Sequence, residues 1–280
     1  MDINTLKRNA SQIYLTLVPF LTAAIGLGVG YMSYKIYLPV WILNVCLMIW
    51  ALSILSVPVL KTQDKEKKHL TASALFLIIP WIFISIIGGL GRPPFGNTAE
   101  WIASQTEQEI RYIVLIIAGI LYAFGFALLR EKLRNTSGDF YSMIGFIAMQ
   151  IAIPLFVMDM TFLNFYVNKL YGIMSESGLN KVPEWAKPTA NQFNFFPVII
   201  GSLIFISTAA FATALKKTGQ LKPAACNIYI AISLLGFLLT VLPNAVPEPL
   251  ATASFIATIP AVPLFMPYLM GINLLKTTNR

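Results

Sequence analysis

Residues 38–60, "LPVWILNVCLMIWALSILSVPVL", form an uncharged and almost wholly apolar run. A helix needs about 20 consecutive apolar residues to cross the hydrocarbon core of a bilayer, and this run is long enough. In water, a helix that is apolar on every side would have to be buried on every side. The run therefore predicts a membrane-spanning helix.

The rest of the chain repeats this pattern. Apolar runs of comparable length occur at about 15–33, 38–60, 70–90, 112–129, 141–165, 196–215, 224–242 and 250–275. Composition agrees, because 57% of the residues are hydrophobic and 11% are charged, against roughly half and a quarter in soluble domains. A membrane β-barrel would show short alternating segments instead. We expect an all-α polytopic membrane helix bundle of about eight transmembrane helices, with residues 1–280 as a single integral membrane domain.

The basic residues indicate the orientation of these helices. The net charge of +8 would suggest nucleic acid in a soluble protein, but its distribution argues against such a partner. If the amino terminus is cytoplasmic, 14 of the 20 Lys and Arg residues fall on the cytoplasmic side, where basic residues of short loops concentrate. They lie near both termini and in the segments 61–69, 130–139 and 216–222. We expect both termini in the cytoplasm and the chain in a cell (inner) membrane.

The sequence lacks the residues that several kinds of catalysis and cofactor binding require. The chain has one histidine, His69, which excludes paired-imidazole haem ligation and H-E-x-x-H zinc sites. It has no Walker sequence, no G-x-S-x-G and no paired acidic motif. Its two cysteines lie in different apolar runs at a spacing that fits no metal framework. We expect no cofactor and no metal site, and no ATP-driven pump in this chain alone.

Asp159, in "LFVMDMTFLNF" (155–165), is the acid placed within an apolar run. A helix that starts near Asp139 would carry it roughly 30 Å across the membrane, close to the outer boundary. Acids inside membrane helices are functional candidates because removing them from water is costly. A structural hydrogen bond or ion pair is the alternative, and the sequence leaves both open.

The segment 91–112, "GRPPFGNTAEWIASQTEQEIRY", carries the second group of candidates. Glu107 precedes Arg111 by four residues, the favourable order for a helical ion pair, and Glu109 lies between them. If these side chains face the bundle, they would join Asp159 in a polar cluster. Trp101 reads as an ordinary anchor at the headgroup level. The segment is either a tether between two spans or part of an external site.

The segment 166–195 is the longest external connection, and its "VPEWAKP" portion interrupts helical structure. We expect it to lie over the outer mouth of the bundle, with Trp185 at least partly buried, and to form a lid together with residues 91–111. Weaker candidates for substrate binding are Asn164, Asn194 and Glu248.

The last apolar run contains Pro260, Pro263 and Pro267. Each proline removes a backbone donor and frees a carbonyl from its helical bond. Freed groups at membrane depth must be satisfied by protein or water, and broken helices of this kind line transport sites. A kinked helix held by its neighbours is the structural alternative.

Three functions fit these observations. The first is a secondary transporter or channel-like permease with an acidic external vestibule. The second is a cofactor-free membrane enzyme that acts on a lipid or isoprenoid through carboxylate acid and base chemistry. The third is a non-catalytic subunit of a membrane complex. The partners are accordingly membrane lipid, a small-molecule or lipid substrate and, in the third case, another membrane protein.

Overall fold

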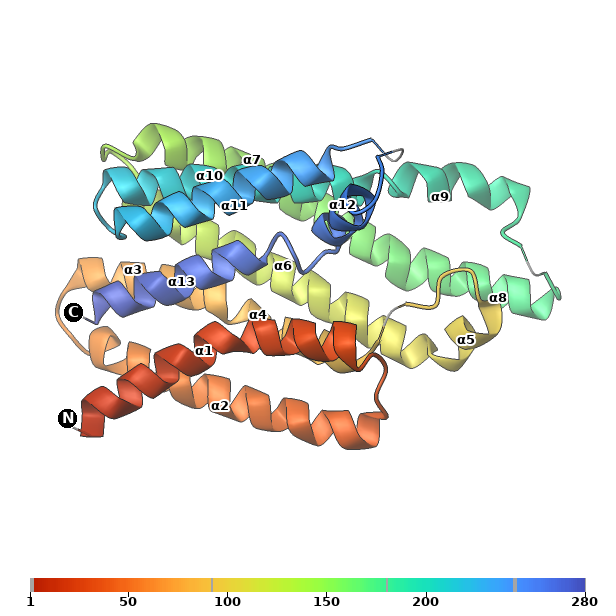
Figure 1. Cartoon of the computed structure of the whole chain (residues 1–280), viewed down its shortest axis with the longest axis horizontal. Coiled ribbons are helices and arrows are strands. Elements are labelled where there is room, and N and C mark those ends of the chain that lie inside the picture. The colour runs from red at the N-terminus through yellow and green to blue at the C-terminus, as the bar shows by residue number, and fades with distance from the viewer. Residues whose placement is uncertain (1–2, 92, 180, 244–245, 280) are drawn as a thin grey trace.

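The computed structural model describes residues 3–91, 93–179, 181–243 and 246–279, and the fold is all-α (Figure 1). Asp2, Arg92 and Arg280, which entered the charge distribution, lie outside these ranges. The elements of the first half are α1 (Ile3–Gly28), α2 (Tyr34–Leu60), α3 (Lys65–Ile78), α4 (Pro80–Ile84), the 3₁₀-helix η1 (Ser85–Gly89), α5 (Thr98–Ala103) and α6 (Gln105–Leu133).

The second half continues in the same style, with one π-helix inserted in a long helix. Its elements are α7 (Asp139–Thr161), the π-helix η2 (Phe162–Val167), α8 (Asn168–Glu176), η3 (Glu184–Ala186), α9 (Lys187–Phe193), α10 (Phe196–Lys217), α11 (Pro223–Thr240), α12 (Leu250–Thr258) and α13 (Phe265–Thr278).

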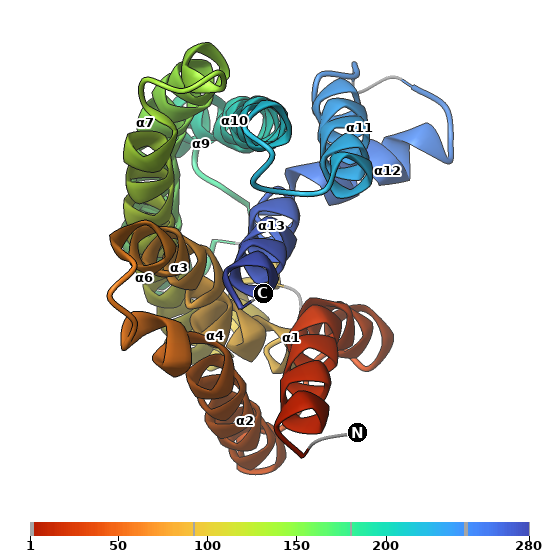
Figure 2. The ribbon, with the colours of Figure 1, turned by 90° about the vertical axis from the view of Figure 1, so that its left-hand side faces the viewer.

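The chain runs back and forth along one axis, and each pass is antiparallel to the one before it (Figure 1). The passes are α1, α2, α3 to η1, α6, α7 to α8, α9 to α10, α11, and the irregular segment 259–264 with α13; α12 itself lies across this axis (Figure 2). Both termini lie at the same end of the bundle, which we call the terminal end; the opposite end is the far end. Arg8 Nη2 donates a hydrogen bond to the Asn279 carbonyl there, so the first and last helices meet.

Six helical segments are long and apolar enough to span a membrane: Lys35–Leu60, Lys65–Gly89, Gln105–Leu133, Asp139–Glu176, Glu184–Lys217 and Pro223–Thr240. The protein is therefore a multi-span helical membrane protein. The remaining two apolar runs form α1 and the pair α12 and α13. Helices of 9 and 14 residues measure about 14 and 21 Å, so neither α12 nor α13 crosses a bilayer alone.

The apolar side chains fall into two sets, which suits a bundle surrounded by lipid. Helix α13 lies between the other helices in the end-on view (Figure 2), and its Tyr268, Met270 and Leu274 are fully buried. Helix α2 instead exposes much of its apolar surface, including Ile36 and Trp50. Water would penalise that exposure, whereas hydrocarbon does not.

The external segment 166–195 differs from the expected loop. Helices α8 and α9 extend the long passes beyond the far ends of α1 and α2 (Figure 1). Trp185 is 61% exposed, so the expectation that it packs against the bundle is wrong. Helical structure stops after Glu176 and resumes through the short 3₁₀ turn η3 into α9; Pro188 does not interrupt α9, because prolines are tolerated in the first turn of a helix. Closure of this segment as a lid stays a prediction.

Candidate functional site

Asp159 lies in the last turn of α7 and is 3% exposed. It lines a small cavity together with Gly201 of α10, Thr258 of α12, and Pro260 and Pro263 of the last pass. The cavity has a volume of about 10 Å³, close to the space that one water molecule needs. Asp159 of α7 therefore faces the break between α12 and α13.

The break is the turn between α12 and α13, which contains Pro260 and Pro263. Ile259 leaves helical geometry at the end of α12, and helical structure resumes only at Phe265. The carbonyl at the restart, Leu264 O, accepts hydrogen bonds from the Tyr122 hydroxyl at 3.1 Å and from Trp81 Nε1 at 3.5 Å. Pro267 does not interrupt α13, because it falls in the first turn, where helical amides have no partner to lose. The Leu264 carbonyl also accepts from the Tyr268 amide at 3.3 Å, so the aromatic donors fix the start of α13 and the last pass is discontinuous before it.

Arg111 does not form the expected pair with Glu107. No ion pair joins their side chains, although both residues are described. Arg111 is 4% exposed, and its Nη2 donates to the carbonyls of Leu90 at 3.0 Å and Gly91 at 2.8 Å. These carbonyls follow the end of η1 and have no helical partner of their own. The guanidinium therefore turns inward to them, while Glu107 remains half-buried.

Helices α6 and α7 share a register that can be followed from one contact. A Cβ on Gly119 would lie 2.8 Å from Phe156 Cδ1, so these two residues sit at one level. At 1.5 Å per residue, Tyr112 lies about 10 Å and Asn164 about 12 Å farther toward the far end, with Asp159 about 5 Å along the same path. Asp159 and Tyr112 are therefore offset by only about 5 to 6 Å along the bundle axis.

This level of the bundle is rich in buried polar groups without partners. Gln108 Oε1, Arg111 Nε, Tyr112 Oη and Asn164 Oδ1 are buried and make no hydrogen bond with the part of the chain that is described. Gln108 is 1% exposed and Tyr112 and Asn164 are each 3% exposed. Buried polar atoms are almost always hydrogen-bonded in folded proteins. Such a group of exceptions marks the α6–η2 contact as a candidate site, which we call the outer cluster.

Sequence reasoning missed Gln108 and Tyr112 and named Arg111 and Asn164. The missed signal is the spacing of residues 108, 111 and 112, which places three polar side chains on one face of a helix. The π-helix is a second signal, because π-turns occur frequently at functional sites. It lies directly after Asp159 and carries Asn164.

The stretch 91–112 is anchored through Trp101 rather than stretched as a tether. Trp101 is fully buried, so its expected place among the lipid headgroups is wrong. Its ring stacks on Tyr171 with centroids 4.6 Å apart, and its Nε1 donates to Asn168 Oδ1 at 2.7 Å. The Tyr171 hydroxyl in turn accepts from the Gly96 amide at 2.7 Å. Helix α5 is thereby fixed against α8, beside the outer cluster.

The other sequence candidates lie apart from this arrangement. Asn194 and Glu248 are exposed, and Glu248 Oε2 accepts from the Thr252 hydroxyl at 2.8 Å. Glu109 accepts from Gln105 Nε2 at 2.9 Å. Each therefore has a local environment of its own. Within the described ranges, no group of three His, Cys, Asp or Glu residues is placed to hold a metal ion.

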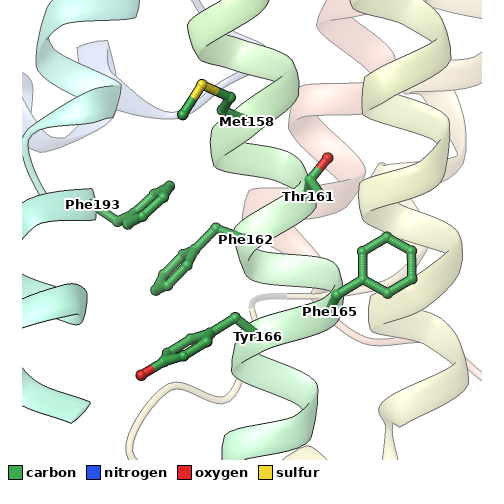
Figure 3. Close-up of a pocket in the computed structure, with 6 residues that line it drawn as sticks. All are labelled: Met158, Thr161, Phe162, Phe165, Tyr166 and Phe193. Atoms are coloured by element: carbon green, nitrogen blue, oxygen red, sulfur yellow. The ribbon is translucent and has the colours of Figure 1, made fainter. Parts of the chain in front are cut away.

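A lateral groove of about 350 Å³ opens on the other side of the α7–η2 turn (Figure 3). Phe193 of α9 stacks on Phe162, with centroids 3.8 Å apart, and Phe162 stacks on Tyr166. Met158, Thr161 and Phe165 complete the lining. The groove is aromatic and apolar, and Asp159 does not line it.

Comparison with known proteins adds no relative: no family model, no curated protein and no solved structure matches this chain. Its class therefore rests on the helical architecture described above.

Proposed function

We propose that this protein is a secondary transporter of a cell (inner) membrane, with its substrate site between Asp159 and the break in the last pass. The observation that carries the proposal is the burial of an intramembrane acid against a discontinuous helix. Transporters place their sites at such breaks because unwound backbone can bind a solute or ion inside the membrane. A structural carboxylate would be better served by a direct cationic partner.

In this proposal all the passes, including α1 and the last pass, cross the membrane, and the terminal end faces the cytoplasm. The support is the gathering of basic residues in the segments that connect helices at that end. Reporter fusions after Lys68, Arg134 and Lys217 should all report the cytoplasm, and one after Gly178 should report the opposite side. Any reversed signal would overturn this topology.

Alternating access gives a test that needs no known substrate. In a background with Cys46→Ala and Cys226→Ala, Thr258→Cys places one thiol at the Asp159 cavity. A membrane-impermeant thiol reagent should label it from either side, in right-side-out and in inverted vesicles, because the site opens to each side in turn.

The matched control is Leu235→Cys on α11, whose native side chain is 56% exposed toward the surroundings of the bundle. A lipid-facing thiol should stay unlabelled from both sides. Labelling of Thr258→Cys from one side only, or from neither, would contradict the transporter.

The lateral groove favours a second candidate, an enzyme that acts on a lipid. An acyl or isoprenoid chain fits an open aromatic groove beside a membrane helix. The enzyme would need Asp159 to reach that groove, whereas the acid faces α10 and the break instead. The transporter is therefore the better supported function.

A further inference from the structure

Two hydrogen-bond donors on consecutive residues of α6 have no partner in the described chain. They are Arg111 Nε and the Tyr112 hydroxyl, both deeply buried. The Arg111 Nη2 group is already engaged by the Leu90 and Gly91 carbonyls. The guanidinium is thereby held in place while its Nε has no partner in the described chain, and the next residue of the helix carries a second such donor.

The charge of Arg111 is also uncompensated. An arginine does not shed its proton in a protein, and no carboxylate of a described residue forms an ion pair with this guanidinium. A buried charge without a counter-charge is strongly unfavourable. Two backbone carbonyls supply only dipoles, so the site has the character of an anion receptor.

We propose that the outer cluster binds the carboxylate group of a small organic anion, through Arg111 Nε and the Tyr112 hydroxyl. A planar guanidinium with a neighbouring hydroxyl matches the two oxygens of a carboxylate. At the same level, Gln108 Oε1 and Asn164 Oδ1 are acceptors without partners in the described chain, and they would accept from a hydroxyl or amine elsewhere on the solute. This inference rests on the proposed function in one respect, since it names the class of substrate that the transporter carries and places its carboxylate at the outer cluster, farther toward the far end than the Asp159 site.

Asp159 gives the anion a partner in transport. On the register set by Gly119 and Phe156, Asp159 and Tyr112 are offset by only about 5 to 6 Å along the bundle axis, so a bound carboxylate and an ionised Asp159 would repel each other. A proton from water at the far end, transferred to an Asp159 oxygen as a new O–H bond, removes this repulsion. The charged and titratable groups around the Tyr112 hydroxyl are Arg111, Asp159 and Tyr171. The anion and one proton therefore enter together.

Binding is measured on the purified protein in detergent, by thermal unfolding with acetate or lactate in place of chloride at equal ionic strength. Ligands that bind the folded state raise the unfolding temperature with concentration. We expect both carboxylates to raise it in the wild type, and at least as much in Asp159→Asn, which imitates the protonated acid. Inorganic phosphate serves as the comparison anion.

Tyr112→Phe is the decisive variant. Its hydroxyl makes no hydrogen bond with the described residues, so its loss should not weaken the fold. It should nevertheless weaken acetate binding about tenfold or more, as expected for a hydrogen bond to a charged group. The matched control is Tyr122→Phe, which removes a hydroxyl bonded to Leu264 O and should lower stability while leaving acetate affinity unchanged.

Three results would overturn the inference: no shift with either carboxylate, a shift with phosphate alone, or unchanged acetate affinity in Tyr112→Phe. None of these concerns two-sided labelling of Thr258→Cys, so the site and the transport function fail separately.

Discussion

At the terminal end of the bundle the charged residues pair with one another, whereas at the far end two charges are buried apart. Arg130 meets Asp139 at 2.7 Å, and Lys132 meets Glu66 at 2.7 Å; both cationic side chains are largely covered, and Glu66 is exposed. Arg111 and Asp159 have no such ion pair within the described structure and are almost fully buried.

The difference separates two uses of charge in a membrane protein. At the terminal end the covered cations Arg130 and Lys132 each have a carboxylate partner, so neither charge is left uncompensated. Inside the far half, Arg111 and Asp159 are removed from water without a counter-charge from a described residue, which is costly, and the two carbonyls that accept from Arg111 offset part of that cost for it. Substitutions of charged residues in the far half should therefore change function and stability more than matched substitutions at the terminal end.

Asp159→Asn should have the largest effect, a complete loss of transport with the folded protein still inserted. An amide cannot alternate between a charged and a neutral form, so Thr258→Cys should then be labelled from one side only. Asp139→Asn at the terminal end should keep two-sided labelling. Two-sided labelling in Asp159→Asn would show that Asp159 takes no part in the mechanism.

Trp101→Ala should be the most destabilising of the substitutions compared here. Removing a buried tryptophan costs about 3–5 kcal/mol, and this ring also holds Asn168 and Tyr171. The exposed Trp185, from the same end, provides the control: Trp185→Ala should change stability by less than about 0.5 kcal/mol. Unfolding in mixed detergent micelles measures both. Equal losses would show that α5 is not fixed through Trp101.

Arg111→Met should lower the free energy of unfolding by a smaller amount, about 2–3 kcal/mol, because hydrogen bonds from a charged donor to two carbonyls are lost. Arg134→Met provides the terminal-end control, since Arg134 is exposed and its Glu131 partner is 3.7 Å away. We expect that variant to lie within about 0.5 kcal/mol of the wild type. A similar cost for both variants would erase the contrast between the ends.

Run length predicted the helical architecture well, because it is a property of contiguous sequence; the orientation that the charge bias predicts stays a prediction. Six of the expected spans are present as long apolar helices. The last run shows why the count of eight was less secure, since its length is divided by the turn that contains Pro260 and Pro263. A hydropathy average does not detect such a turn.

The candidate site was less predictable, because its burial depends on contacts between distant segments. Trp101 is covered by α8, which lies far along the chain, whereas Trp185 has no such cover. Both look like interfacial tryptophans in the sequence. Likewise, Glu107 follows the spacing rule for a pair with Arg111, but carbonyls at the end of η1 compete successfully for the guanidinium.

The π-helix between α7 and α8 amounts to one extra residue accommodated in a helix, since its hydrogen bonds close one residue later than those of an α-helix. Deleting one residue there, such as Phe165, which points outward at 65% exposure, would restore a regular helix. Residues of α8 would keep their present direction and still meet Trp101. The position of Asn164 relative to Asp159 would change. We expect the fold to tolerate the shorter chain and the outer cluster to be lost.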